Sequence, residues 1–387
     1  MVGGRTRRRP HYEKDIVGPV ERFDERKTGY SRADRKEYPG PDEAIEAGLA
    51  HKVPKRMRGF LREDFALNSA GRAIDTLVRK YAYSREDFPR RWAFEGEPLH
   101  VDNPVRMTEE VKAVARWFGA DLVGVCELDM RWVYSVWGDH NAKLGPDVQV
   151  GDPVVIPEGC RYAIAFAVEM DYEDVMRSPA VIPSTDLGYS KMAFVATSLA
   201  EYIRLLGYKA VPSGNDMALT IPICVDAGLG ELSRSGMLIT AEYGPRVRIA
   251  KVFTDLPLEP DEPVDLGVQA FCEVCKKCAD HCPGKAITHG DKMVEARMEC
   301  NNSGVRKWQI DAQKCLAFWV KNGTAGCANC IRSCPWNKPP GWMHRLVRTG
   351  IKAVPALNPL FVRVDGLLGY GRPGLSPTPG RKYRRRR

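Results

Sequence analysis

Apolar and polar residues alternate along the chain in a way that predicts a mixed helix and strand protein. Apolar residues at helical spacing predict a helix that begins at an N-cap, Thr108, and ends at Gly119, and a long helix over residues 187–206. Short apolar runs predict strands over residues 122–128, 161–168, 209–212, 237–241 and 246–253. Because helices and strands alternate, these segments favour a layered α/β or α+β fold, and we expect the α+β class.

Changes in composition divide the chain into four parts. Residues 1–100 are rich in Arg, Asp, Glu, Pro and Gly and have weak periodicity, which predicts an N-terminal arm with short helices at 59–65 and 70–83. Three prolines among acidic residues in 256–266 predict a linker and a domain boundary near residue 265. We therefore expect an arm (1–100), a core (101–265), a cysteine-rich domain (266–340) and an extended basic tail (341–387).

The charge of the chain is concentrated at its ends. The net charge is +9, but the basic residues near the two termini supply ten positive charges: Arg5, Arg7, Arg8, Arg9, Arg381, Lys382 and Arg384 to Arg387. The body between them is close to neutral, so we expect no nucleic-acid-binding face. We expect no transmembrane helix either, since no apolar stretch approaches 18 residues. Without a visible signal peptide we expect a cytoplasmic protein, unless processing has removed an export signal.

Nine of the twelve cysteines lie between residues 272 and 334, and their spacing predicts iron–sulfur clusters. Cys272, Cys275, Cys278 and Cys282, followed by Pro283, match the run C-x2-C-x2-C-x3-C-P of bacterial ferredoxins, whose fourth cysteine ligates the other cluster. A second group departs from this run: Cys315, Cys327, Cys330 and Cys334, followed by Pro335. If the last cysteine of each group ligates the cluster of the other group, two 4Fe–4S clusters are predicted. One is bound by Cys272, Cys275, Cys278 and Cys334, and the other by Cys282, Cys315, Cys327 and Cys330.

Cys300 is left over and is interpreted as a bystander. Structural zinc sites use four ligands in two pairs and do not need two C-x3-C-P endings, so zinc is the weaker interpretation. The core holds no P-loop. The sequence Gly228-Leu229-Gly230 resembles the start of a dinucleotide fingerprint, but Ser233 stands where the third glycine belongs. A redox enzyme fed by the clusters is therefore favoured over a bare electron carrier, because a large core precedes them.

Several motifs resemble the cobalamin-dependent reductive dehalogenases. These motifs are the cysteine pattern, the sequence segments Val252–Leu258 and Ala227–Glu231, and the tripeptide Cys334-Pro335-Trp336. The resemblance covers about residues 101–342. It implies a nitroreductase-like core that binds cobalamin, followed by a ferredoxin-like domain with two 4Fe–4S clusters. In such enzymes cob(I)alamin removes a halogen from an aromatic or alkenyl carbon, and hydrogen replaces it. The resemblance also implies that the lower base of the cobalamin is detached. No histidine is expected as a cobalt ligand, since Asp139 and His140 are adjacent rather than spaced as D-x-H-x-x-G.

The resemblance also suggests site residues. Tyr189 matches the proton-donating tyrosine of the family, and Asn215 matches a position that lines the substrate pocket. A cation beside a phenol makes it a better acid, and Arg248 or Lys251 is expected in that role. These two cations have opposite parity on one strand, so only one is expected to face the pocket. Alternatively, Arg246, Arg248 and Lys251 guard an exposed edge strand. Gly228, Leu229, Gly230 and Ser233 are expected to approach the cobalamin tail.

Two other functions remain open at this stage. Epoxyqueuosine reductases share the cobalamin core and both clusters, but they usually carry an Asp before the tyrosine, where this chain has Gly188. A non-catalytic electron-transfer protein would bind no corrinoid. For the dehalogenase, an organohalide is the expected substrate, and an external reduced ferredoxin or flavodoxin is the expected electron donor, with the basic ends helping it to dock. The oligomeric state cannot be predicted.

Overall fold

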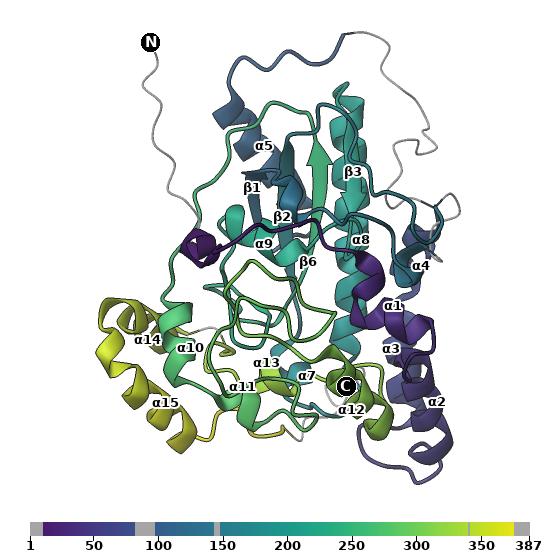
Figure 1. The fold of residues 1–387 in the computed structure, drawn as a ribbon, viewed down its shortest axis with the longest axis vertical. Helices are drawn as coiled ribbons and strands as arrows, with labels where there is room; N and C mark the ends of the chain where they lie inside the picture. The colour runs from purple at the N-terminus through teal and green to yellow at the C-terminus, as the bar shows by residue number, and fades with distance from the viewer. Residues whose placement is uncertain (1–10, 82–96, 143–147, 340, 375–387) are drawn as a thin grey trace, which may run out of the picture.

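A four-stranded sheet forms the centre of the molecule in the computed structural model (Figure 1). The structure describes residues 11–81, 97–142, 148–339 and 341–374, so the basic residues at both ends of the chain lie outside the described residues. The strands lie in the order β1 (Leu122–Glu127), β2 (Tyr162–Glu169), β6 (Val247–Thr254) and β3 (Ala210–Ser213). Neighbouring strands are antiparallel, with Val168 opposite Arg248 and Ser213 opposite Lys251.

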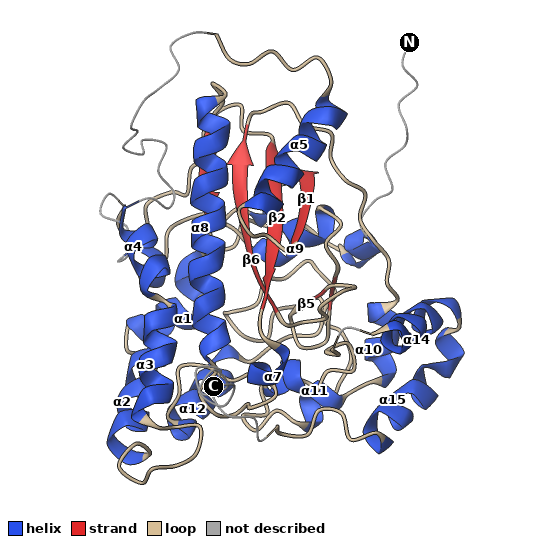
Figure 2. Cartoon of the chain, turned by 180° about the vertical axis from the view of Figure 1, so that it is seen from behind, coloured by secondary structure: helices blue, strands red, loops and turns tan. Residues whose placement is uncertain are grey.

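Helices cover both faces of this sheet. On one face α5 (Pro104–Trp117) and the long α8 (Pro183–Leu205) pack against Ile164, Phe166 and Val168 of β2 (Figure 2). On the other face α9 (Thr220–Asp226) packs with Ala163 and Ala165. Side chains of a strand alternate between the two faces of the sheet. The uninterrupted apolar run of β2 therefore fits a strand that is buried on both sides, as predicted.

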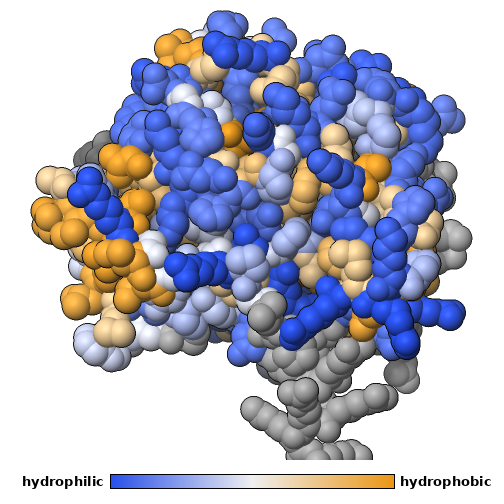
Figure 3. All heavy atoms as spheres, turned by 90° about the horizontal axis from the view of Figure 1, so that it is seen from below, coloured by the Kyte–Doolittle hydropathy of each residue, from blue (hydrophilic) through white to orange (hydrophobic). Residues whose placement is uncertain are grey.

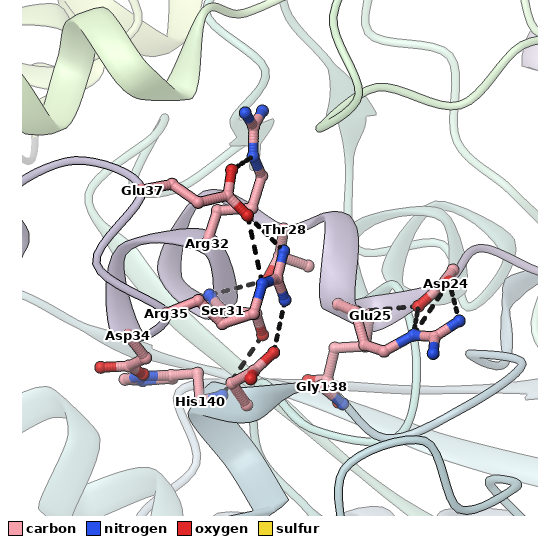
Figure 4. Close-up of polar contacts among 12 residues, drawn as sticks. Asp24, Glu25, Thr28, Ser31, Arg32, Asp34, Arg35, Glu37, Gly138 and His140 are labelled. Atoms are coloured by element: carbon pink, nitrogen blue, oxygen red, sulfur yellow. Dashed lines mark hydrogen bonds and ion pairs between the residues drawn. The ribbon is translucent and has the colours of Figure 1, made fainter.

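The N-terminal arm forms short helices that pack against the core. The helices α1 (Gly29–Asp34) and α2 (Pro41–His51) contact α12 (Ala312–Asn322), while α3 (Arg62–Gly71) and α4 (Ala73–Tyr81) lie against α8. The arm also contains two 3-10 turns, at His11–Asp15 and Glu25–Lys27. Polar contacts attach this part of the arm to α6 (Asp139–Ala142) and the residue before it: the Asp34 carboxylate accepts from His140 Nδ1 at 2.7 Å, and Glu25 accepts from the Gly138 backbone at 2.8 Å (Figure 4).

The cysteine-rich domain consists of short helices joined by loops. Its helices are α10 (Val268–Val274), α11 (Lys277–Asp280), α12 and α13 (Asn329–Arg332). Residues 341–374 do not form the extended tail that was expected, because they fold into α14 (Trp342–Ala353) and α15 (Asn358–Leu367). The inner side of these helices is held by apolar contacts, since Ile351 and Phe361 join a cluster with Phe271 of α10. The glycines and prolines of this region hid an amphipathic pattern.

The smaller elements of the core are the 3-10 turn Met130–Trp132, the helix α7 (Tyr172–Val175), and the hairpin of β4 (Glu231–Leu232) and β5 (Leu238–Ile239). A further 3-10 turn, Pro355–Leu357, joins α14 to α15. In the ranges that the structure describes, no helix is both long enough and apolar enough to cross a membrane.

Two local predictions were wrong. The helix α5 is capped by Asn103, whose side chain accepts from the Arg106 backbone, and not by Thr108, which lies inside the helix and donates to the Glu259 carbonyl. Pro104 explains the earlier start, because its ring sets the backbone angle that the first helical position requires. The edge-strand interpretation of the cations on β6 is also wrong, since β6 lies between β2 and β3 and Lys251 is fully buried.

Candidate functional site

Tyr189 lies in the first half of α8, on the side of that helix that faces the sheet and the N-terminal arm. The side chain is half-buried, and its Oη accepts a hydrogen bond from Asn215 Nδ2 at 3.2 Å. Two guanidinium groups lie over its ring, with their central carbons at 4.9 Å (Arg248) and 4.2 Å (Arg72) from the ring centroid. The structure therefore brings together Tyr189, Asn215 and Arg248, three residues selected from the sequence.

Arg248 reaches Tyr189 because its position along β6 places its side chain on the face of the sheet that α8 covers. Ala250 and Val252 share its face of the sheet and pack in the core cluster under α8. Its Nε atom is buried and has no hydrogen-bond partner among the described residues. A buried donor without a partner is costly, so this atom is suited to an anionic or polar group of a ligand. This is the observation that fits a bound cofactor or substrate at the site.

Lys251 points to the opposite face and anchors a loop. Its Nζ donates to the carbonyls of Gly214 at 2.7 Å and Asp216 at 2.8 Å, and to Thr220 Oγ1 at 2.9 Å. Burial lowers the pKa of this amine to about 8, with nearby Asp216 opposing the shift, so the ammonium is mostly protonated at neutral pH. Because the loop 214–220 carries Asn215, Lys251 acts on the site indirectly, and Arg248 is the cation that lies against Tyr189.

Replacing Lys251 with methionine is expected to lower the free energy of unfolding by about 3 kcal/mol, because four carbonyl or hydroxyl oxygens lose their donor and Asp216 loses a nearby charge. Chemical denaturation measures this loss. The matched control is Lys209→Met, whose ammonium donates to the Glu158 carbonyl at an exposed site. Equal stability of the two variants would show that the loop does not depend on Lys251.

Gly188 leaves the space that the Arg248 side chain occupies. A Cβ atom on residue 188 would lie 2.8 Å from Arg248 Cγ and 3.4 Å from its Cβ, which are atoms near the main chain and not at the flexible end of the side chain. A larger residue at 188 therefore displaces Arg248 from Tyr189. The Asp that is usual before the tyrosine in epoxyqueuosine reductases does not fit here together with Arg248.

We expect Gly188→Ala to lower the rate of the reaction at the Tyr189 site by roughly a hundredfold. The added methyl group displaces Arg248, and small displacements of a positioned group carry losses of that order. Single-turnover kinetics measures the step. Gly366→Ala is the control, since no atom lies within 4 Å of the added Cβ. A Gly188→Ala variant as fast as wild type would mean that Arg248 adjusts without loss.

The N-terminal arm adds two residues that the sequence analysis missed. Arg72 follows α3 and forms ion pairs of 3.2 Å with Asp75 and with Asp186, which lies one turn before Tyr189. Tyr30 of α1 stacks on His140 with ring centroids 5.0 Å apart. Burial raises the pKa of the Tyr30 hydroxyl, and the nearby Tyr189 and Cys315 raise it further. Tyr30 thus lies close to both Tyr189 and one of the cluster cysteines.

The candidate cluster cysteines influence one another electrostatically. Burial raises the pKa of the Cys278 thiol, and its thiol neighbours Cys334, Cys272, Cys330 and Cys275 raise it further. Burial likewise raises the pKa of Cys330, whose thiol neighbours are Cys327, Cys315 and Cys282. The assignment of these cysteines to two clusters by exchange of the last cysteine stays a prediction.

Several donors surround these thiols. The Ala286 backbone donates to Cys282 Sγ at 3.3 Å, and such hydrogen bonds help to set the potential of a cluster. Cys300 lies apart, where its Sγ donates to the Ile310 carbonyl at 3.6 Å. Among the described residues, no three His, Cys, Asp or Glu side chains are close enough to hold one metal ion.

Protein atoms surround the turn that was expected to approach cobalamin. A Cβ on Gly228 would lie 2.5 Å from the Glu262 carbonyl oxygen, and one on Gly230 would lie 2.1 Å from that of Ile239. Ser233 Oγ donates to the Met237 carbonyl at 2.9 Å within the β4–β5 hairpin, and Leu229 is part of the core. Packing alone explains why these two glycines lack side chains. Contact of Gly228, Leu229, Gly230 and Ser233 with cobalamin stays a prediction.

Comparisons with known proteins first define the class. A family model described as a 4Fe-4S double cluster binding domain matches residues 271–337, so the chain contains such a domain. A solved catabolic reductive dehalogenase in complex with 3-bromo-4-hydroxybenzoic acid matches nearly the whole chain, with a TM-score of 0.71 and 26% identity over 96% of this chain and 50% of that chain. The mixed helix and sheet fold described above is thus a reductive dehalogenase fold.

Among the sequence relatives of the chain are tetrachloroethene reductive dehalogenases. The tetrachloroethene reductive dehalogenase of Dehalobacter restrictus is 40% identical over 313 residues, which is 72% of this chain and 56% of that protein. The enzyme of the same name from Sulfurospirillum multivorans is 39% identical over 304 residues, 72% of this chain and 60% of that protein. The chain is a homologue of the reductive dehalogenases, as predicted from its motifs, and it spans little more than half the length of these relatives.

Proposed function

We propose that the chain catalyses reductive dehalogenation. In this reaction an organohalide takes up two electrons and one proton, the carbon–halogen bond breaks, a carbon–hydrogen bond forms and halide leaves. The observation that carries the proposal is the convergence of Asn215 and Arg248 on Tyr189. The tetrachloroethene named for the relatives makes a chlorinated alkene the first substrate to test.

We assign the proton transfer to Tyr189. Its hydroxyl gives the proton to the carbon that loses halide, and the guanidinium of Arg248 then stabilises the phenolate that remains. Asn215 holds the hydroxyl in place through its 3.2 Å hydrogen bond. Arg72, Asp75 and Asp186 form a buried charge network that keeps the ring oriented from the side of the N-terminal arm.

The proposed cofactors are cobalamin and two 4Fe–4S clusters. Cobalamin, when bound in a nitroreductase-like core, supplies the reducing metal centre for the organohalide. The family resemblance implies that its lower base would be detached, and no histidine is nominated as a cobalt ligand because the D-x-H-x-x-G motif is absent. Cys282, Cys315, Cys327 and Cys330 would hold the cluster nearer to the reaction, since Cys315 and Tyr189 are both neighbours of Tyr30. The other four cysteines would hold the second cluster of a ferredoxin-like domain, where electrons arrive from a ferredoxin or flavodoxin.

Halide release tests the proposal. The protein is reconstituted anaerobically with iron, sulfide and cobalamin, given a strong reductant, and incubated with chlorinated alkenes and with brominated and chlorinated phenols. Halide release that depends on the corrinoid is the expected result, and a corrinoid-free sample is the control. Full corrinoid occupancy without halide release would contradict the proposal. Failure to retain any corrinoid would instead support an electron carrier.

Epoxyqueuosine reduction is the weaker alternative because of Gly188. The Arg248 side chain occupies the space beside this residue, so no acidic side chain stands there to donate a proton. An epoxyqueuosine reductase of Lactococcus garvieae is 30% identical over 132 residues, but this covers only 30% of the chain. The cytoplasmic location stays a prediction.

A further inference from the structure

The outer side of α14 and α15 is an exposed apolar face. Ten large hydrophobic side chains there, between residues 342 and 368, are 41% to 85% exposed: Trp342, Met343, Leu346, Val347, Val354, Leu357, Leu360, Val364, Leu367 and Leu368. We call these ten residues the α14–α15 face. Figure 3 shows hydrophobic side chains gathered at the left of the molecule seen from below, the side on which these helices lie in Figure 1. A contiguous apolar patch of this kind marks an interaction site.

The two helices are firmly attached through their inner side, so the face is a formed surface. Ile351 is buried against the cluster domain, and Phe361 and Val362 pack with it. The carboxylate of Asp365 is 6% exposed and pairs with Lys338 at 2.5 Å and with Lys277 of α11. The inner contacts explain the fold of α14 and α15. They leave the ten outer side chains without a partner among the described residues.

The chain segment that carries the face is strongly basic. Residues 341–387 contain eleven Lys and Arg residues and one acidic residue, Asp365, whereas the other 340 residues contain 47 basic and 48 acidic residues. Asp365 is buried in its ion pairs, and the sequences of α14 and α15 contain no other carboxylate. Lys352 and Arg363 are exposed beside the apolar side chains. The excess positive charge of the whole chain is therefore concentrated in the segment that carries the face.

We propose that the α14–α15 face docks on an anionic lipid surface. Amphipathic helices bind at a bilayer interface when they combine large apolar side chains with basic residues, and basic segments are attracted to anionic headgroups. An acidic electron carrier would complement the positive charge of this segment. However, the interfaces of transient redox complexes are small, and non-obligate protein interfaces are no more apolar than ordinary protein surface, unlike the α14–α15 face. A second copy of this chain would cover the apolar side chains of the face, but it would bring two positively charged patches together. Lipid satisfies both observations.

Vesicle sedimentation of the reconstituted full chain tests the proposal without reference to dehalogenation. We expect at least tenfold tighter partitioning to phosphatidylcholine vesicles containing phosphatidylglycerol than to phosphatidylcholine alone. The double variant Leu346→Glu/Leu367→Glu is expected to lose at least tenfold of this binding. Val155→Glu is the control, because Val155 is equally exposed but lies far along the chain from the face. The visible absorbance of the clusters verifies that each variant is folded.

Three outcomes would overturn the proposal. The first is equal binding by the double variant and the control. The second is a loss of all binding when Arg384 to Arg387 are replaced by glutamine while the double variant still binds, which would assign attachment to the tail alone. The third is no sedimentation with anionic vesicles, accompanied by self-association or by saturable binding to a reduced ferredoxin, which would make the face a protein interface.

Discussion

Tyr189→Phe is expected to reduce corrinoid-dependent halide release by about a thousandfold, which is within the usual contribution of a positioned general acid. The substitution removes only the hydroxyl that accepts the hydrogen bond from Asn215, and it keeps the ring that packs against the guanidinium groups of Arg72 and Arg248. Cobalamin and iron contents are expected to stay unchanged. The measurement is the initial rate of halide release at saturating reductant, with corrinoid occupancy determined on the same sample.

Tyr202→Phe is the matched control for this prediction. Tyr202 lies on the same helix, and its hydroxyl donates to Glu110 at 2.8 Å, away from the site. We expect wild-type turnover from this variant. Wild-type turnover by Tyr189→Phe with full corrinoid would remove the tyrosine from the mechanism and leave the proton to water. Arg248→Leu, measured in the same assay, shows whether the adjacent cation contributes.

The second large effect is expected from Cys315→Ala. Loss of one thiolate from the group of Cys282, Cys315, Cys327 and Cys330 removes a cluster, so iron and acid-labile sulfide fall from about eight to about four per chain. Halide release with a protein electron donor is expected to vanish, because this group would hold the cluster proposed to lie nearer to the reaction. Metal analysis and paramagnetic resonance of the reduced protein measure the remaining cluster.

Cys300→Ala provides the control for the cluster prediction. Its thiol contacts the Ile310 carbonyl and lies outside both thiol groups, so both clusters are expected to remain. A fall to four irons in Cys300→Ala, together with eight irons in Cys315→Ala, would exchange the roles of these two cysteines. Cys300, and not Cys315, would then supply the cysteine that the second group lacks relative to the ferredoxin run.

Local patterns were a good guide wherever neighbours along the chain decide the structure. The long helix and the strands appear close to their predicted bounds, because apolar periodicity reflects which face of an element is buried. The same reasoning failed for residues 342–367, where glycines and prolines suggested an extended tail and two helices form. Here the inner face packs on the cluster domain through contacts that are remote in sequence, and such contacts override weak local signals.

The cysteine spacing by itself determined the double-cluster domain, and the motifs determined the relation to the reductive dehalogenases, because thiolate spacing restricts which metal centre a loop can bind. Only the tertiary structure decided which cation meets Tyr189. Alternation along β6 separates Arg248 from Lys251, but the side on which α8 packs settles which of them reaches the phenol. The approach of Arg72 and Tyr30 was likewise invisible in the sequence, since the arm reaches the site only by packing against α8 and α12.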